Sequence, residues 1–332
     1  MVLRAGLIGL GMMGRNHARV LQSVDGIELR VVADPLGDTT GAVRTGTVVD
    51  TVDALLDHEL DICVVACPTE DHERVGLALA DRGVHALVEK PLALDLPAAR
   101  RLAAAFDAAG LVGAVGHIER SNAAIRSLRT RLLAGEIGEV FQVATRRIGP
   151  FPDRIRDVGV VKDLATHDLD LSAWVGGSRY KTIAARTVSK AGREHEDLVA
   201  ATGVLDDGTV TSHLVNWLTP FKERLVVATG ERGCLIADTL LADLTLYKNG
   251  SVPVEWDSIS GFRGVSEGDV IRFAIPKPEP LRVQLEHFRD AVLGRPAEIV
   301  TMSEGMAAVA VADAAIESAR TGTALDVEQD LP

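Results

Sequence analysis

Short apolar runs alternate with longer amphipathic stretches over the first 120 residues. The apolar runs have the length, and the bounding glycines or prolines, of strands that are buried on both faces. The stretches between them have helical spacing, so the pattern predicts parallel strands joined by helical crossovers. We therefore expect an α/β fold whose first domain, residues 1–120, is a doubly wound parallel sheet. Its expected strands are 3–9, 28–35, 60–68, 85–91 and 111–117.

The pattern changes beyond residue 120. Strand-like segments now follow one another through turns, and Asp-Asp-Gly at 206–208 predicts a hairpin. We therefore expect a second, α+β domain over 121–332 with an open, mostly antiparallel sheet. A last helix, at about 303–321, has a small-residue face and is expected to pack back on the first domain. The other expected helices are 121–138 and 162–177, and the expected strands are 141–149, 181–190, 197–219, 223–239 and 241–250.

The strands of this second sheet carry apolar residues on both faces. Val210 and Leu214, for example, are opposed by Val215 and Trp217. A sheet that is covered by helices on one face, and is apolar on the other, tends to bury its second face in an assembly. We expect a homodimer or homotetramer that forms through this sheet.

Composition and charge argue against several classes of function. A net charge of −12 over 332 residues argues against binding to nucleic acid or to an anionic membrane. No apolar run approaches the ~20 residues of a membrane helix, and the N-terminal stretch lacks the cleavage site of a signal peptide. Cys63, Cys67 and Cys234 lack metal-ligand spacing and indicate reduced thiols. We expect a cytoplasmic protein that binds no metal.

A glycine motif separates the first strand from the first helix. Gly9 permits the tight turn, Gly11 lets the backbone approach a pyrophosphate, and Gly14 lets helix and strand pack closely. The N-terminus of the helix then attracts the phosphates. Asp34 ends the second strand, where a carboxylate binds the adenosine ribose hydroxyls and repels a 2′-phosphate. A lone glycine motif is often an ordinary turn, but these features in this order predict a Rossmann site for NAD.

Ligands of a parallel sheet bind at the carboxyl ends of its strands, which here carry Pro68, Thr69, Lys90 and His117. Lys90 is the candidate of most interest, because a lysine at this edge can donate a hydrogen bond to a substrate hydroxyl and stabilise an alkoxide. The alternative is an ordinary surface lysine before a loop.

Asp163 and His167 are four residues apart and share one face of an expected helix. A carboxylate next to an imidazole orients the ring and raises its basicity, which suits proton transfer to or from a carbinol oxygen. The alternative is a helix that Asp163 caps and against which His167 packs. Asp168 and Asp170 are expected on other faces, exposed to solvent.

Arginines are concentrated at 146–156 in an otherwise acidic chain. Arginine binds phosphate in a bidentate manner, so the cluster of Arg146, Arg147, Arg154 and Arg156 could hold the diphosphate of a nucleotide sugar. Salt bridges to surface carboxylates explain the same charges equally well.

The segments GLIGLGMMGRNHA, CPTEDH, VEKP and DLATHDLDL resemble the glucose-fructose oxidoreductase/inositol dehydrogenase (Gfo/Idh/MocA) family over essentially the whole chain. VGHIER, RRIGPFPDRIRDVGVVKDLATHDLDL and VNWLTPFKERLVVATG are similar, more narrowly, to UDP-N-acetylglucosamine 3-dehydrogenases. The resemblance implies that Lys90, Asp163 and His167 line the site and that Pro68 and His72 belong to a loop at the nicotinamide ribose. Ser121 and Lys162 depart from the usual pattern, which leaves the sugar open.

The expected function is hydride transfer from a sugar carbinol, favoured as the 3-hydroxyl of UDP-N-acetylglucosamine, to NAD, with Lys90, His167 and Asp163 as the catalytic set. Either Lys90 or His167 could be the formal base. The alternatives are a dehydrogenase of a free sugar or a cyclitol such as myo-inositol, and a non-catalytic NAD-binding regulator. The expected cofactor contacts are Gly9, Gly11, Met12, Met13, Gly14, Asp34, Pro68, Thr69, His72, Glu89 and Lys90. The expected substrate contacts are His117, Asn122, Arg147, Arg154, Arg156, Asn216 and Trp217.

Overall fold

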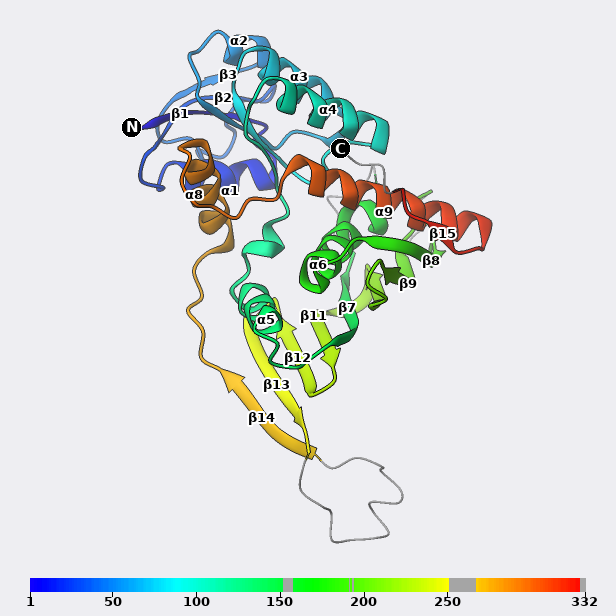
Figure 1. Cartoon of the computed structure of the whole chain (residues 1–332). Coiled ribbons are helices and arrows are strands. Elements are labelled where there is room, and N and C mark those ends of the chain that lie inside the picture. Colours follow the sequence, from blue (N-terminus) through cyan, green and yellow to red (C-terminus); the bar gives the residue numbers. More distant parts are fainter. Residues whose placement is uncertain (152–157, 191, 193, 251–266, 329–332) are drawn as a thin grey trace, which may run out of the picture. The chain divides into compact units, whose positions relative to one another are not determined.

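The computed structural model describes residues 1–151, 158–190, 192, 194–250 and 267–328. These residues form two compact units, and the chain is coloured by sequence in Figure 1. The first unit takes its described residues from Met1–Ile118 and Pro278–Asp313, and the second takes them from Glu119–Lys277 and Ala314–Glu328. Each unit has its own sheet and its own hydrophobic core.

A parallel sheet lies at the centre of the first unit. Its strands have the order β3-β2-β1-β4-β5-β6, and each neighbouring pair is parallel. The order reverses between β1 and β4, as in a doubly wound sheet, which confirms the fold class expected for the first domain. The strands are β1 Leu3–Ile8, β2 Ile27–Ala33, β3 Thr47–Val49, β4 Ile62–Val65, β5 His85–Val88 and β6 Gly113–Val115.

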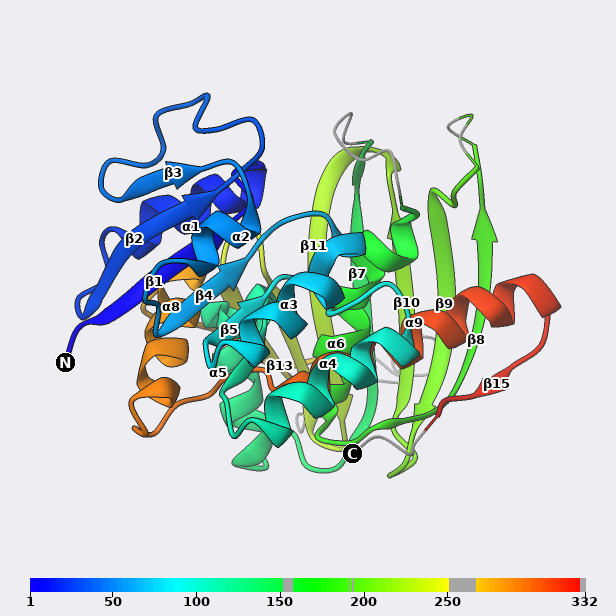
Figure 2. The ribbon, with the colours of Figure 1, turned by 90° about the horizontal axis from the view of Figure 1, so that it is seen from above.

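Helices cover both faces of this sheet (Figure 1). α1 and α8 lie on one face, where Leu21, Leu285 and Phe288 pack into the same core as the strands. α2, α3 and α4 lie on the other face, and α3 packs against α4 (Figure 2). The bounds are α1 Met12–Leu21, α2 Val52–Leu56, α3 His72–Asp81, α4 Leu96–Ala108 and α8 Pro280–Val292, with a 3₁₀ turn at Thr69–Asp71.

The second unit contains a mixed sheet of the order β14-β13-β12-β11-β7-β10-β9-β8-β15. β7 and β10 pair in parallel, and their neighbours pair antiparallel, so the expected mostly antiparallel sheet is confirmed. The strands are β7 Val140–Pro150, β8 Tyr180–Val188, β9 Leu198–Leu205, β10 Val210–Asn216, β11 Leu218–Gly230, β12 Gly233–Asp238, β13 Asp243–Asn249, β14 Glu267–Phe273 and β15 Leu325–Asp326.

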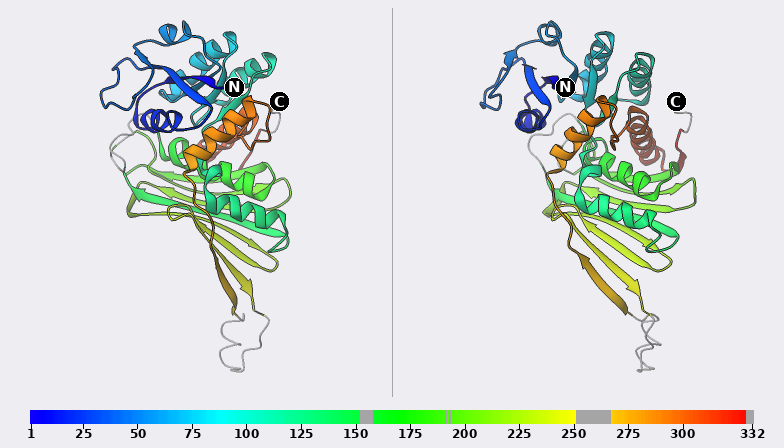
Figure 3. Two further views of the ribbon diagram at one scale, coloured as in Figure 1. Left: turned by 90° about the vertical axis from the view of Figure 1, so that its left-hand side faces the viewer. Right: turned by 60° about the vertical axis from the view of Figure 1, so that its left-hand side comes forward.

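α5 and α6 lie on one face of this sheet (Figure 3). Leu128 of α5 and Leu171 of α6 pack on Val226 of β11 in the core of the unit. A 3₁₀ turn at Ile118–Ser121 precedes α5 Ala123–Leu133, and a π-helical turn at Val161–Ala165 leads into α6 Thr166–Gly176. α9 Met302–Thr321 contributes its first part to the first unit and its last part to the second. Among the described helices, none combines the length and the apolar character that a membrane span requires.

Candidate active site

The glycine-rich loop joins β1 to α1 in a conformation that its glycines make possible. Gly9 has a φ of +94°, and a Cβ there would lie 2.6 Å from the carbonyl oxygen of Ala66. A Cβ on Gly14 would lie 1.9 Å from the carbonyl oxygen of Gly9, whereas a Cβ on Gly11 would meet no atom within 4 Å. The loop is therefore tight at Gly9 and Gly14 and open at Gly11, where a pyrophosphate must approach the backbone.

Asp34 ties the end of β2 to this loop. Its Oδ2 accepts a hydrogen bond from the backbone N–H of Leu10 at 2.6 Å, and its Oδ1 accepts one from Leu36 at 2.9 Å. A carboxylate oxygen can accept more than one hydrogen bond, so the partly buried carboxylate retains capacity for ribose hydroxyls. The residues of the loop and of β2 thus fit an NAD adenosine and its pyrophosphate.

Pro68, Thr69 and His72 follow β4 and differ in their exposure. Pro68 is exposed and Thr69 is partly exposed, so both can meet a ligand. His72 is 1% exposed, and its ring nitrogens lie 2.9 Å from the carbonyl oxygen of Pro91 and 3.1 Å from that of Cys67. Burial lowers the pKa of His72. His72 therefore contacts the backbone of two loops, and a direct contact of its ring with the cofactor stays a prediction.

Met12 and Met13 begin α1 in different surroundings. Met12 is 45% exposed, next to the open part of the glycine loop, and Met13 packs on the core of the unit. His117 follows β6 and is buried, at 2% exposure. The cofactor contacts of the two methionines and the substrate contact of His117 stay predictions.

Glu89 and Lys90 follow β5 directly. Lys90 is partly exposed. The Glu89 carboxylate is buried; its Oε1 lies 2.7 Å from Nε2 of His17 on α1, and its Oε2 accepts the backbone N–H of Lys90 at 3.2 Å. Burial acts to raise the pKa of Glu89, but the hydrogen bond and charge of His17, with the charge of Lys90, bring it below its ordinary value. Motif spacing did not indicate His17, because its partner lies 72 positions away in the chain.

Asp163 and His167 occupy adjoining turns of the second unit. Asp163 lies in the π-helical turn and His167 lies in the first turn of α6. Both side chains are partly exposed. Short π-helical turns are found frequently at functional sites. The structure thus keeps the two side chains on neighbouring turns of one continuous helical segment.

The expectation that Asp168 and Asp170 are exposed to solvent is wrong. Asp168 is 1% exposed and Asp170 is 3% exposed, because each is paired with an arginine inside the unit. Arg120 donates to both carboxylate oxygens of Asp170, at 2.8 and 2.5 Å. Arg147 donates to Asp168 and to Glu119, both at 2.8 Å. Buried charges persist when they are paired in this way.

Arg147 therefore belongs to a buried ion cluster with Asp168 and Glu119. Arg147 is 2% exposed. Burial acts to raise the pKa of Glu119, yet the charge and the hydrogen bond of Arg147 bring it below its ordinary value. Burial raises the pKa of Asp168, against the charge of Arg147. Through its hydrogen bond to Asp168, Arg147 connects β7 to α6. Substrate binding by Arg147 stays a prediction. Arg154 and Arg156 lie outside the described residues.

The remaining expected substrate residues have local structural partners. Asn122 caps α5 by accepting the backbone N–H of Ala124 at 3.0 Å, and it donates to the carbonyl oxygen of Thr239 at 3.0 Å. Asn216 accepts the backbone N–H groups of Leu218 and Thr219 through its Oδ1. Trp217 is 3% exposed, and its ring stands edge-on to Phe151 with centroids 5.5 Å apart. A role of these three residues in substrate binding stays a prediction.

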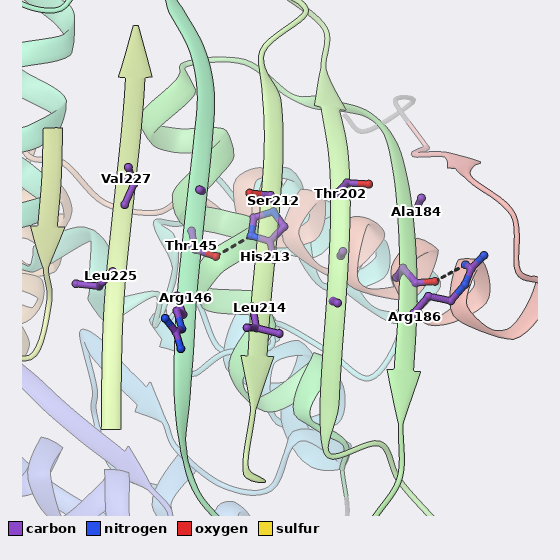
Figure 4. Close-up of a pocket in the computed structure, with 14 residues that line it drawn as sticks. Thr145, Arg146, Ala184, Arg186, Thr202, Ser212, His213, Leu214, Leu225 and Val227 are labelled. Atoms are coloured by element: carbon purple, nitrogen blue, oxygen red, sulfur yellow. Dashed lines mark hydrogen bonds between the residues drawn. The ribbon is translucent and has the colours of Figure 1, made fainter. Parts of the chain in front are cut away.

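A hollow of about 720 Å³ lies on the open face of the second sheet, away from Asp163 and His167 on the helical side. β7, β8, β9, β10 and β11 all contribute to it (Figure 4). Small or apolar side chains line most of it, among them Ala184, Ser212, Leu214 and Val227.

Two family models match the chain. The model described as oxidoreductase family, NAD-binding Rossmann fold, matches residues 3–117. The model described as oxidoreductase family, C-terminal alpha/beta domain, matches residues 129–327. Both are models of the Gfo/Idh/MocA family, and together they span most of the chain.

Individual relatives agree with the family models. A UDP-N-acetylglucosamine 3-dehydrogenase of Acidithiobacillus ferrooxidans is 30% identical over 293 residues, which cover 87% of this chain and 88% of that protein. Inositol 2-dehydrogenase 2 of Saccharopolyspora erythraea is 27% identical and covers 99% of this chain and 96% of that protein. The structure of GenD2 from gentamicin A biosynthesis, in complex with NAD, has a TM-score of 0.82 at 27% identity and covers 99% of this chain and 97% of that one.

Proposed function

The chain belongs to the Gfo/Idh/MocA oxidoreductase family and has its NAD-binding Rossmann domain, and from this premise we propose that it is an NAD-dependent dehydrogenase of a sugar carbinol. One observation carries the reaction class: the glycine-rich loop, Asp34 and Lys90 all follow carboxyl ends of strands in one parallel sheet. A dinucleotide loop and a cationic donor at the same sheet edge suit oxidation of an alcohol.

In the proposed reaction, different residues bind the cofactor, stabilise the developing charge and accept the proton. Bound NAD supplies the acceptor for the hydride that leaves the carbinol carbon. The ammonium of Lys90 donates a hydrogen bond to the carbinol oxygen and stabilises the negative charge that develops there. His167 accepts the hydroxyl proton, and Asp163 orients the imidazole for that transfer. Gly9, Gly11, Gly14 and Asp34 bind and orient the cofactor.

The favoured substrate is UDP-N-acetylglucosamine, oxidised at its 3-hydroxyl. Support comes from the relative with that activity, which is 30% identical over 87% of the chain. The described arginines give no independent support, because the guanidinium of Arg147 is already paired. A cyclitol is the second candidate, since an inositol 2-dehydrogenase matches 99% of the chain at 27% identity.

The test is NADH formation, followed by absorbance, with NAD and either UDP-N-acetylglucosamine or myo-inositol. We expect turnover with the nucleotide sugar, and we expect Lys90→Ala and His167→Ala each to lower kcat about 10²–10⁴-fold while NAD affinity is kept. Lys181→Ala, at an exposed position of β8, is the matched control and should match the wild type. Turnover near the wild-type rate in either test variant would remove that residue from the mechanism. Turnover of myo-inositol alone would select the second candidate.

We also propose that the open face of the second sheet forms a contact between copies of this chain, in a homodimer or homotetramer. The support is its apolar hollow and its exposed Val204 and Val210, at 36% and 43%. Leu214→Glu places a charge in the hollow (Figure 4), and we expect light scattering to show a shift from the oligomer towards the monomer. Phe141→Glu, at an exposed residue outside the hollow, should leave the mass unchanged. A monomeric wild-type protein would contradict the proposal.

A further inference from the structure

A buried pair, His17 and Glu89, connects the cofactor-binding helix to the turn that carries Lys90. His17 lies on α1, one turn after Gly14, and is 0% exposed. Its Nε2 lies 2.7 Å from Oε1 of Glu89, which is 7% exposed. A buried carboxylate is costly unless donors surround it. The pair therefore fixes where the end of β5 meets α1.

The second oxygen of Glu89 is used within the turn itself. Oε2 accepts the backbone N–H of Lys90 at 3.2 Å, so the carboxylate holds the residue that follows it. Gly116, at the end of β6, makes room for this arrangement. A Cβ on Gly116 would lie 2.8 Å from Oε2 and 3.0 Å from Cα of Glu89. The carboxylate thus occupies a place that a side chain at residue 116 would fill.

The partners of this pair have defined roles. The pKa of Glu89 lies below its ordinary value despite burial, so its carboxylate is ionised and can only accept hydrogen bonds. Nε2–H of His17 is therefore the donor to Oε1. Nδ1 of His17 is buried and has no hydrogen-bond partner among the described residues, so the contact with Glu89 is the one described hydrogen bond of the ring. A fixed negative charge is then held one residue away from Lys90.

His72 contacts the same turn from the other side. It lies at the start of α3, and its ring contacts the carbonyl oxygens of Pro91 and Cys67. The Lys90–Pro91 turn is therefore held between a histidine on α1 and a histidine on α3. Neither histidine contacts Gly9, Gly11 or Asp34 through a described hydrogen bond, so the two sets of residues can be tested separately.

We propose that His17 is a positioning residue that, through Glu89, places Lys90 for the oxidation of the carbinol. The inference rests on the proposed function, in which Lys90 contacts the substrate oxygen. Misplacement of a catalytic group by about 1 Å can cost up to about 100-fold in rate. Loss of the N–H donor of His17 should therefore reduce kcat, while the NAD loop keeps its own hydrogen bonds and its affinity.

The experiment compares His17→Leu, which removes the donor, with His17→Gln, which restores an N–H donor. A brief pulse of acetic anhydride at a series of pH values, read by mass spectrometry of the Lys90 peptide, reports the surroundings of the Lys90 amine without NAD or substrate. For each variant, an NADH titration measures the affinity for the cofactor, and kcat is measured with the sugar substrate. His85→Leu is the matched control, because His85 begins β5 at its far end and accepts the N–H of Val112 at 2.8 Å.

We expect His17→Leu to shift the labelling profile of Lys90, to lower kcat about 10–100-fold, and to change the NADH affinity little. His17→Gln should recover most of both properties, and His85→Leu should leave both as in the wild type. Should His17→Leu fail to fold, His17→Asn serves in its place, since its shorter amide keeps polarity but loses reach. An unchanged Lys90 labelling profile in the folded variant overturns the proposal. A shifted profile in a protein that oxidises no tested sugar supports the positioning by His17 and refutes the proposed function alone.

Discussion

The two units hold their candidate catalytic side chains by different means. In the first unit, the turn at Lys90 is held by one histidine–carboxylate pair and by a histidine that contacts two backbone carbonyls. In the second unit, the helix that carries His167 is held from within by buried arginine–carboxylate pairs: Arg147 with Asp168 and Glu119, and Arg120 with Asp170.

This difference has an energetic consequence. Loss of His17 in the first unit removes one of the two described hydrogen bonds to Glu89, and the carboxylate keeps the backbone N–H of Lys90. Loss of an arginine in the second unit leaves a buried carboxylate without its main counter-charge, which is strongly destabilising. Substitutions in the first set should therefore act mainly on catalysis, and those in the second should act mainly on stability.

Arg147→Met tests the importance of the buried ion cluster for stability, and we expect its effect to be the largest. The change leaves Asp168 and Glu119 buried without their main partner, so we expect the free energy of unfolding to fall by about 3–5 kcal/mol. Denaturant unfolding measures the loss. Arg320→Met, on α9, is the matched control: its side chain is 70% exposed, its pair with Glu317 is 2.5 Å long, and its loss should change the free energy of unfolding little. Equal stabilities of the two variants would show that the buried cluster contributes nothing special.

Arg147→Met also separates the two interpretations of the arginine-rich segment. If Arg147 held a substrate diphosphate, the variant would lose affinity for UDP while keeping its stability. If Arg147 holds α6 to β7, as its contacts with Asp168 and Glu119 indicate, the main effect of the substitution is a lower free energy of unfolding. Calorimetry of UDP binding to a folded Arg147→Lys variant separates the two further: weaker binding than the wild type supports the diphosphate role, and unchanged binding supports the structural role.

The sequence predicted the features that depend on local spacing. Buried strands, the turn at Gly9, and Asp34 at the end of β2 are encoded within a few residues of one another, and the structure reproduces them. The expected fold class is confirmed for the same reason: alternation of apolar and amphipathic segments specifies the order of strands and helices.

The features that depend on distant partners were not predictable in this way. Asp168 and Asp170 looked like exposed residues because their arginine partners lie 21 and 50 positions away in the chain. α6 is buried over much of its surface, so the usual assumption of one solvent-facing side does not hold for it. α8 likewise packs in the first unit although its sequence follows the second sheet. Local pattern carries no information about such pairings.

A smaller effect is the loss of stability in acid that we expect from a buried histidine of the second unit. His213 of β10 lies in the second unit at 4% exposure, and Thr145 lies 2.8 Å from its Nδ1 (Figure 4). The hydroxyl of Tyr180 lies 2.8 Å from its Nε2. Burial lowers its pKa from 6.5 to about 3. The folded state therefore keeps His213 neutral where the unfolded state takes up a proton, so stability is lost as the pH falls below 6.5 and the loss continues towards pH 3.

The contribution of His213 to this loss should approach about 1.4 kcal/mol for each pH unit below 6.5. His213→Gln keeps polar atoms near Thr145 and Tyr180 but cannot titrate, so its unfolding free energy should fall less steeply with acid than that of the wild type. The stability difference between the two proteins should be constant above about pH 7 and should shrink below it. Parallel curves down to about pH 5 would mean that His213 is protonated in the folded state, and that the second unit accepts a buried cation without a carboxylate beside it.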